Sequence, residues 1–298
     1  DIAGYADEAV GVTSRYGQLW VSNAVAVTPS ASGSNFWAFS VPGALGTQQV
    51  VAAIRDGAGN MGYATNTFFL TAVTNAAGSV TDIRYRGPQY ESTLGLEWDG
   101  EYRLVALYTN GALAERNGYD ALGRRVWTWT ADGGTNWYVY DGPNVVAEVD
   151  AGGGLRRSYV YGPSLTGEAN AIDELLAMSV YQSGQTNRYY FLKDHVGTVL
   201  ALVDESGAIV ETYRYDAWGR LLGVYDASSL PIPESQVGNR FLFQSREYSW
   251  SAHHATAGAG LYFFRARWYD PIAGRWLSKD PIGISGGLNQ YSFAGESP

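Results

Sequence analysis

Short runs of alternating apolar and polar residues fill the first part of the chain. Gly, Ser, Asn or Pro separates each run from the next, and the runs are residues 18–21, 36–41, 49–54 and 66–70. A period of two is typical of half-buried strands, and punctuation of this kind marks tight turns. The pattern predicts a small β-sandwich over residues 1–73.

The turn at residues 56–60, which reads Asp-Gly-Ala-Gly-Asn, adds detail to this sandwich. It resembles the loop before the last strand of bacterial immunoglobulin-like (Ig-like) repeats, so we expect the sandwich to be Ig-like. Strand-like sequence begins almost at Asp1, which is consistent with a sandwich that lacks its first strand.

From about residue 83 the chain becomes a repeat of an aromatic residue, an acid and a turn residue. The first four copies start 21 residues apart and two later copies are more loosely spaced, at Trp98, Tyr119, Tyr140, Tyr161, Tyr215 and Tyr269. Such a step accommodates two strands of about seven residues and two turns, which predicts one β-hairpin per repeat.

The repeated residues are expected to pack and turn the chain. We predict that the ring of one repeat packs on the ring of the next to form a ladder, and that Asp and Gly supply the turns. The residues concerned are Trp98, Tyr119, Asp120, Tyr140, Asp141, Tyr161, Tyr215, Asp216, Tyr269 and Asp270.

Composition supports an all-β fold and excludes several functions. The 22 Tyr, 10 Trp and 37 Gly favour strands joined by tight turns. A net charge of −9 would repel a phosphate backbone, so we predict no nucleic-acid partner. Cysteine is absent, which excludes disulfides without fixing the compartment. No apolar run approaches the length of about 18 residues that a membrane helix needs, so we expect no membrane span.

Two motifs that suggest enzymatic chemistry are better explained as turns. Residues 57–62 match the dinucleotide fingerprint Gly-x-Gly-x-x-Gly, but strands flank them and the phosphate-binding helix is missing. Residues 283–287 match a nucleophile elbow, but no histidine follows Ser285. We therefore predict no cofactor.

Metal binding is not expected either. The histidines are His195, His253 and His254, and neighbours on a strand point to opposite faces, so we assign them surface or packing roles. Residues 56–60 offer too few acids for more than a weak calcium site.

The repeat copies carry a family resemblance. Tyr-Asp-x-x-Gly-Arg occurs at Tyr119 and Tyr215, and Asp-His-Val-Gly-Thr occurs at residues 194–198. Residues 260–289 read Gly-Leu-Tyr-Phe-Phe-Arg-Ala-Arg-Trp-Tyr-Asp-Pro-Ile-Ala-Gly-Arg-Trp-Leu-Ser-Lys-Asp-Pro-Ile-Gly-Ile-Ser-Gly-Gly-Leu-Asn and resemble the repeat-associated core of the Rhs/YD-repeat family. The resemblance covers residues 83–298.

This resemblance implies a domain order and a use. Residues 83–258 are expected to form a curved ribbon of antiparallel hairpins, followed by the core motif at residues 259–298. Ribbons of this family spiral into a hollow shell that encloses an attached polypeptide, commonly a toxin.

The resemblance also carries over two residues of an autoproteolytic site, Arg267 and Asp280. In the family the second aspartate lies further along, beyond the position of Pro298, so we expect no cleavage by this chain alone. The structural alternative is a buried ion pair that pins the core motif.

Three functions follow as hypotheses. The first is a fragment of a bacterial toxin-type shell, exported to the cell surface or beyond, whose partner is a C-terminal cargo polypeptide. The second is an extracellular structural or filament protein that self-associates by β-strand addition at an unpaired edge. The third is adhesion to a cell-surface glycan through the abundant aromatic side chains.

Overall fold

The computed structural model describes residues 2–5, 16–21, 26–27, 31–32, 36–39, 46–55, 61–87, 90–163, 174–254 and 259–294. Within these ranges the regular structure is almost entirely β-strand. The helical elements described are two short 3₁₀ helices, η2 (Phe243–Ser245) and η3 (Gly283–Gly286). The all-β fold predicted from the sequence is confirmed.

The first part of the chain contributes strands to two sheets. One sheet has the order β1-β5-β4, and in the other β2 pairs with both β3 and β6. The bounds are β1 (Ile2–Tyr5), β2 (Tyr16–Val21), β3 (Ala26–Val27), β4 (Ala31–Ser32), β5 (Phe36–Phe39) and β6 (Gly46–Arg55).

The Ig-like character of this region stays a prediction. The loop at residues 56–60, which carries the resemblance and the weak calcium ligands, lies outside the described residues. Strand β7 (Met61–Thr74) pairs with β6 and with β8 (Val80–Gly87). The sheet therefore passes without a break through the domain boundary expected between residues 73 and 83.

Strands β6 to β20 form one antiparallel ladder in which each strand pairs with the next along the chain, and β21 pairs with β20. The remaining bounds are β9 (Tyr90–Trp98), β10 (Leu104–Thr109), β11 (Ala112–Tyr119), β12 (Arg125–Thr130), β13 (Gly134–Asp141), β14 (Asn144–Asp150), β15 (Leu155–Tyr161), β16 (Leu175–Gln182), β17 (Gln185–Lys193), β18 (Val199–Val203), β19 (Ile209–Tyr215), β20 (Leu221–Asp226) and β21 (Pro231–Ile232). This is the hairpin ribbon expected from the 21-residue step.

Because consecutive strands are antiparallel, the turns of the ribbon lie alternately along two rims, one at each end of the strands. The turns that follow the repeated aromatic residues of the ribbon all fall on one rim, which we call the tyrosine rim. These residues are Trp98, Tyr119, Tyr140, Tyr161 and Tyr215. The tyrosine rim comprises the connections after β7, β9, β11, β13, β15, β17 and β19. We call the rim at the other end of the strands the opposite rim.

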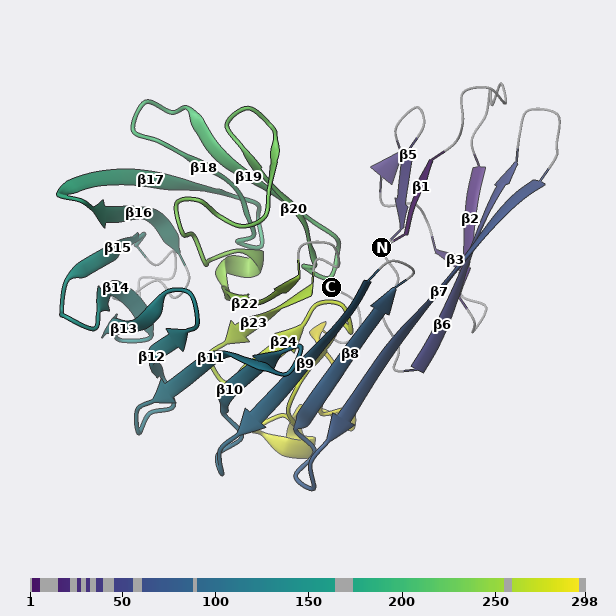
Figure 1. Ribbon diagram of the computed structural model, residues 1–298, viewed down its shortest axis with the longest axis horizontal. Coiled ribbons are helices and arrows are strands. Elements are labelled where there is room, and N and C mark those ends of the chain that lie inside the picture. The colour runs from purple at the N-terminus through teal and green to yellow at the C-terminus, as the bar shows by residue number, and fades with distance from the viewer. Residues whose placement is uncertain are drawn as a thin grey trace.

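A β-bulge recurs in the ribbon immediately before the repeated tyrosine. The register shifts between Gly118 and Tyr119, Val139 and Tyr140, Val160 and Tyr161, and Arg214 and Tyr215. A bulge bends a strand and increases its twist, so recurrent bulges contribute to the curvature of the ribbon. Figure 1 shows the ribbon from β7 to β20 bending around the centre of the molecule.

A separate four-stranded sheet lies inside this curve. Its strands are β22 (Glu247–His254), β23 (Ala259–Phe264), β24 (Arg267–Asp270) and β25 (Arg275–Trp276), paired in that order. Figure 1 shows β22 to β24 between the two limbs of the ribbon. The boundary expected at residue 259 falls inside this sheet, because β22 belongs to it.

Candidate functional site

The inner face of the ribbon holds residues 235–254 and 259–294, which we call the C-terminal segment. Two hydrophobic clusters join the ribbon to the C-terminal segment. In the first, Ile83, Leu94 and Leu107 of the ribbon pack with Leu261 and Trp268 of the C-terminal segment, all at most 2% exposed. Burial of apolar surface therefore fixes β23 and β24 against β8 to β10.

The second cluster is more aromatic and involves strands β13 to β20. Its ribbon members include Tyr159 and Tyr213, and the C-terminal segment adds Tyr262, Tyr269 and Phe293. The rings of Tyr269 and Phe293 are 4.2 Å apart between centroids. Strands β8 to β10 and β13 to β20 thus pack against one segment, which explains why the ribbon curls around it.

A buried chain of alternating charges lies between these clusters. The ribbon supplies Glu115, Arg125, Glu148 and Arg157, and the C-terminal segment supplies Arg240 and Glu247. The order of contacts is Glu115, Arg125, Glu247, Arg240, Glu148, Arg157. Three carboxylates and three guanidinium groups balance one another, as buried charges require.

Among the three carboxylates of the charge chain, Glu148 is the most deeply buried, with 0% exposure. Its Oε1 accepts hydrogen bonds of 2.5 Å from Arg240 Nε and Tyr159, and its Oε2 accepts from Arg157 and Asn136 at 3.1 and 2.7 Å. Burial by itself would raise the pKa of Glu148, but the two arginines outweigh it and lower the pKa to about 2.

Aromatic rings hold the two central arginines of the charge chain. The guanidinium of Arg240 lies 4.3 Å from the ring centroid of Tyr138, and that of Arg125 lies 4.6 Å from the ring of Phe263. Both arginines also donate to Glu247, where they outweigh burial and lower the pKa of this carboxylate. Delocalised, weakly hydrated guanidinium groups suit such a site better than ammonium groups.

Another buried carboxylate, Glu211, lies outside the charge chain and fixes the start of the C-terminal segment. It accepts hydrogen bonds from the Ser235 hydroxyl at 2.7 Å and from the Gln236 and Val237 amides at 2.7 and 3.1 Å. The ribbon therefore binds this segment through side chains that face its interior.

The repeated tyrosines lie at equivalent positions along the tyrosine rim. Each hydroxyl donates to a backbone carbonyl at the start of the preceding strand, over 2.8 to 3.0 Å. The pairs are Tyr119 with Leu104, Tyr140 with Arg125, Tyr161 with Val145, and Tyr215 with Val199. Trp98 donates from Nε1 to Val80 in the same sense.

Arginines, rather than neighbouring tyrosines, cover two of these rings. The guanidinium of Arg103 lies 5.1 Å from the ring centroid of Tyr119, and that of Arg124 lies 4.9 Å from Tyr140. Each arginine also donates from Nε to the aspartate of its own turn, Asp99 or Asp120. This column of Asp, Arg and Tyr differs from the direct ring ladder that we predicted.

The repeated aspartates Asp120 and Asp216 close identical turns. In each, Oδ1 accepts from the amides two and four residues later, and the residue three positions on is a glycine with φ near +80°. Such a φ suits glycine because it has no Cβ. Asp141 differs, since it pairs with Asn144 across a two-residue Gly-Pro turn.

Arg267 and Asp280, the two residues carried over by resemblance, are close together. Arg267 Nη1 lies 3.0 Å from Asp280 Oδ2, and the guanidinium lies 4.2 Å from the ring centroid of Trp276. Their side chains are 17% and 19% exposed, so solvent reaches the pair. Partial burial lowers the pKa of Arg267, against the opposing effect of Asp280.

The last repeat copy is the most deeply buried. The Tyr269 hydroxyl donates to the Trp218 carbonyl at 2.8 Å, and Asp270 Oδ2 accepts from Tyr85 on β8 at 3.0 Å. Asp270 is 1% exposed, and this burial raises its pKa to about 6 despite the hydrogen bonds it accepts.

Of the motifs discounted above, the one at residues 57–62 lies mostly outside the described residues, and the one at residues 283–287 lies beside Asp280, whose carbonyl accepts from the Gly283 amide at 2.9 Å. Residues 283–286 form η3, and His253 Nδ1 is 2.7 Å from the Tyr248 hydroxyl. His195 lies in the turn closed by Asp194. Among the residues described, no group of three or more His, Asp or Glu side chains is placed to hold a metal ion.

Sequence reasoning missed the buried charge chain and the buried carboxylate of Glu211. A signal was present: Glu115 and Asn117 on β11, and Glu211 and Tyr213 on β19, occupy alternate positions that face inward. Polar residues at alternate positions of a strand predict that this face is exposed to solvent, because burial of unpaired carboxylates is unfavourable. Only the fold reveals their partners.

Comparison with known proteins identifies this architecture. Residues 96–298, more than half of the chain, match the family described as teneurin YD-shell. The chain belongs to this YD-shell family, in agreement with the Rhs/YD-repeat resemblance of its motifs.

Two relatives that match about two thirds of the chain are bacterial toxins by name. The chain is 31% identical over 216 residues to the double-stranded DNA deaminase toxin A of Burkholderia cenocepacia, which covers 66% of this chain and 14% of that protein. It is 32% identical over 232 residues to the toxin protein Tse5 of Pseudomonas aeruginosa, covering 69% and 16%. The chain thus spans about a sixth or less of these relatives.

A solved structure supports the fold alone. The crystal structure of TcdB2-TccC3-Cdc42 matches 80% of this chain and 13% of that one, with a TM-score of 0.50 and 17% sequence identity. No helix among the described residues has the length and apolar character that crossing a membrane requires.

Proposed function

We propose that this chain is part of a shell that encloses an attached polypeptide of the toxin type. The observation that carries the proposal is the attachment of the C-terminal segment to the inner face of the curved ribbon through buried charges and two hydrophobic clusters. A segment fixed on the concave side places a polypeptide joined to it on that side. The names of the two toxin relatives support this use.

Protease protection of the natural, longest form of the protein tests the enclosure. We expect the attached polypeptide to resist protease in the native protein and to be digested after acid or urea opens the shell, as followed by mass spectrometry. An attached polypeptide that is digested at the same rate before and after unfolding would refute enclosure. The same mass spectra establish the native termini.

We further infer that Arg267 and Asp280 take part in release of the enclosed polypeptide by self-cleavage. The 3.0 Å pair orients the Asp280 carboxylate, which could then act on water or on the scissile carbonyl together with a second carboxylate. In the natural protein, Asp280→Asn should abolish cleavage on a denaturing gel while Asp226→Asn, in an exposed turn, leaves it intact. Full cleavage in Asp280→Asn would refute this role.

A secondary adhesive function is motivated by the outer face of the ribbon. Trp137 is 44% exposed there, and its ring lies 6.2 Å from that of Trp127. Exposed aromatic rings of this kind can stack on sugars, so we propose a cell-surface glycan as a partner of this face. A glycan array with wild type and Trp137→Ala tests it, and a silent array removes the function. Self-association by strand addition stays a prediction, which light scattering over a range of protein concentrations tests.

A further inference from the structure

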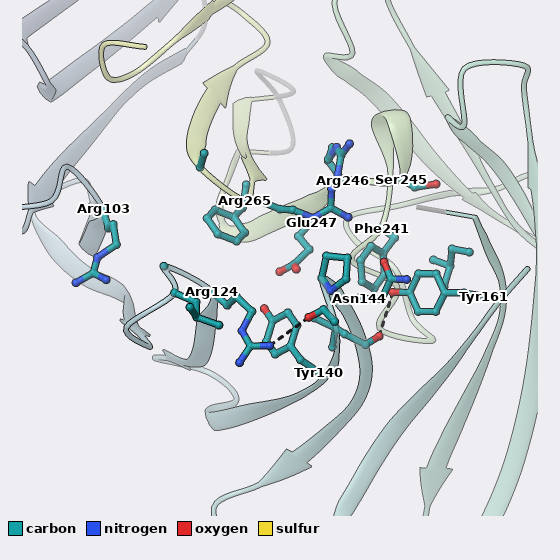
Figure 2. Close-up of a pocket in the computed structure, with 18 of the residues that line it drawn as sticks. Arg103, Arg124, Tyr140, Asn144, Tyr161, Phe241, Ser245, Arg246, Glu247 and Arg265 are labelled. Atoms are coloured by element: carbon teal, nitrogen blue, oxygen red, sulfur yellow. Dashed lines mark hydrogen bonds between the residues drawn. The ribbon is translucent and has the colours of Figure 1, made fainter. Parts of the chain in front are cut away.

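A pocket of about 690 Å³ separates the tyrosine rim from the C-terminal segment. On the rim side it is lined by the turn at residues 121–124 and by residues 142–145. On the other side it is lined by residues 245–247 and by the turn between β23 and β24, with Arg265 and Ala266. Figure 2 shows Arg124 and Tyr140 facing Phe241 and Glu247 across this space.

The pocket interrupts an otherwise close contact. Elsewhere the C-terminal segment reaches the tyrosine rim by hydrogen bonds, from Tyr262 to Gly219 and from Tyr291 to Gly78. At the two rim turns that precede β12 and β14 this segment lines an open space instead. The gap is therefore a local feature of the rim.

The walls of the pocket combine apolar and cationic groups. Tyr140, Tyr161, Leu175 and Phe241 supply rings and aliphatic surface, and Leu122, which also lines the pocket, is 78% exposed. A large exposed apolar side chain beside an apolar pocket is a feature of binding surfaces.

The lining is richer in arginine than in acidic residues, although the whole chain is acidic. The lining contains four arginines and two glutamates, whereas the chain carries −9. The carboxylate of Glu247 is already bound by Arg125 and Arg240, which lie outside the lining. Arg103 and Arg124 are likewise paired, with Asp99 and Asp120 outside the lining, so these two arginines offer a ligand guanidinium donors and not net charge.

Two of these arginines are held in fixed orientations. Arg124 donates from Nε to Asp120 at 2.8 Å and from Nη1 to the Gly142 carbonyl at 3.1 Å. Arg103 repeats both contacts one hairpin earlier, with Asp99 and the Asp120 carbonyl. A guanidinium group held in this way loses little conformational entropy when a carboxylate binds.

We propose that this pocket binds an extended, acidic segment of the attached polypeptide. An Asp or Glu side chain would meet Arg124 and Arg265, and a neighbouring apolar side chain would pack on Tyr140 and Phe241. The volume lies within the range of about 300 to 1,000 Å³ that is usual for ligand sites. A peptide fits better than a small anion because much of the lining is apolar. The inference rests on the enclosure proposed above.

Titration of the 298-residue protein with a labelled peptide tests the pocket directly. The probe is fluorescein-labelled Asp-Leu-Glu-Tyr with blocked termini, and its neutral counterpart is Asn-Leu-Gln-Tyr. We expect the neutral peptide to bind at least tenfold more weakly, because it lacks charge-assisted hydrogen bonds. Equal binding of both peptides, or complete displacement by inorganic phosphate at equal concentration, would overturn the proposal.

Variants locate the binding. Arg265→Gln should weaken the acidic probe at least tenfold, and Ala266→Trp should block it by filling the pocket from an exposed position. The matched control is Arg156→Gln, since Arg156 contacts the Gly133 carbonyl on the opposite rim. Circular dichroism verifies that each variant is folded. Unchanged affinity in folded Arg265→Gln and Ala266→Trp would place the probe elsewhere and refute the site.

Photo-crosslinking in the natural protein separates this inference from the enclosure. A benzoylphenylalanine at position 122 should crosslink to an acidic segment of the attached polypeptide, whereas one at position 230 on the opposite rim should not. Protease protection without a crosslink at position 122 would refute the pocket and leave enclosure standing. Absence of protection would refute enclosure, and the peptide titration then decides the pocket alone.

Discussion

The C-terminal segment is held differently by two parts of the same ribbon. At β8 to β10 the contact is mainly apolar, with Ile83, Leu94 and Leu107 against Trp268. At β11 to β15 it is the chain of six buried charges from Glu115 to Arg157. Apolar burial stabilises broadly and tolerates small shifts, whereas a buried ion pair requires one geometry. We infer that the first contact supplies most of the stability and that the second fixes the position.

The largest expected effect is a break of the apolar contact. Trp268→Ala removes a side chain that is 1% exposed and lies 5.3 Å from the Phe263 ring, so we expect a loss of about 3–5 kcal/mol in the free energy of unfolding. Equilibrium urea unfolding measures it. Trp137→Ala on the outer face should lose less than about 1 kcal/mol. Similar losses at the two positions would contradict the assignment of stability to the inner contact.

A break of the ionic contact should lower the free energy of unfolding by slightly less, and this loss should depend on pH. Glu148→Gln removes the carboxylate that pairs with Arg157 and one of the two that pair with Arg240, which should lower the unfolding free energy by about 3 kcal/mol at pH 7. The pKa of Glu148 is lowered to about 2 from 4.5. Its contribution is therefore fully present above pH 4.5 and is lost as the pH falls toward 2. Urea unfolding from pH 2 to pH 7 should show wild type and variant converging in acid.

The control for this substitution is an exposed pair. Glu91→Gln removes a carboxylate whose Oε1 lies 3.4 Å from Arg84 Nε, with both side chains about half exposed. We expect less than about 1 kcal/mol, because solvent screens exposed ion pairs. A loss in Glu91→Gln equal to that in Glu148→Gln would show that burial does not distinguish them.

Asp270 gives the opposite pH dependence and sharpens the comparison. Its pKa is raised to about 6 by burial, from 3.8 in an unfolded chain. Its contribution is thus fully present below pH 3.8 and is lost as the pH rises through about 6, by an amount on the order of 3 kcal/mol. Asp270→Asn should flatten this decline in urea midpoints between pH 4 and 7. A variant that declines as steeply as wild type would contradict this role.

The sequence was sufficient for the strands and the repeat but not for their partners. Alternation and the 21-residue step predicted the hairpins, since both are local. The charge chain joins Arg125 to Glu247 and Glu148 to Arg240, residues separated by 122 and 92 positions. Nothing local specifies such a pair. The family motif did indicate Arg267 and Asp280, which the fold brings within 3.0 Å.

The role of the repeated tyrosines shows a finer limit of sequence reasoning. Regular spacing predicted that they occupy equivalent positions, and their hydroxyl contacts do recur. The direct ring ladder was not found at Tyr119 and Tyr140, because a bulge precedes each tyrosine and an arginine covers its ring. A bulge depends on pairing between strands, which spacing along the chain does not reveal.

The smallest expected effect concerns one such hydroxyl. Tyr119→Phe removes the 2.8 Å hydrogen bond to the Leu104 carbonyl and keeps the ring under Arg103, so we expect a loss of about 1 kcal/mol. Urea unfolding of Tyr119→Phe and of the control Tyr102→Phe, whose residue is 53% exposed, measures it. Tyr119 also links the tyrosine rim to the apolar contact, because its hydroxyl accepts from Trp268 Nε1 at 3.5 Å. A double variant with Trp268→Ala that loses less than the sum of the single losses would show that the rim and the apolar contact are coupled.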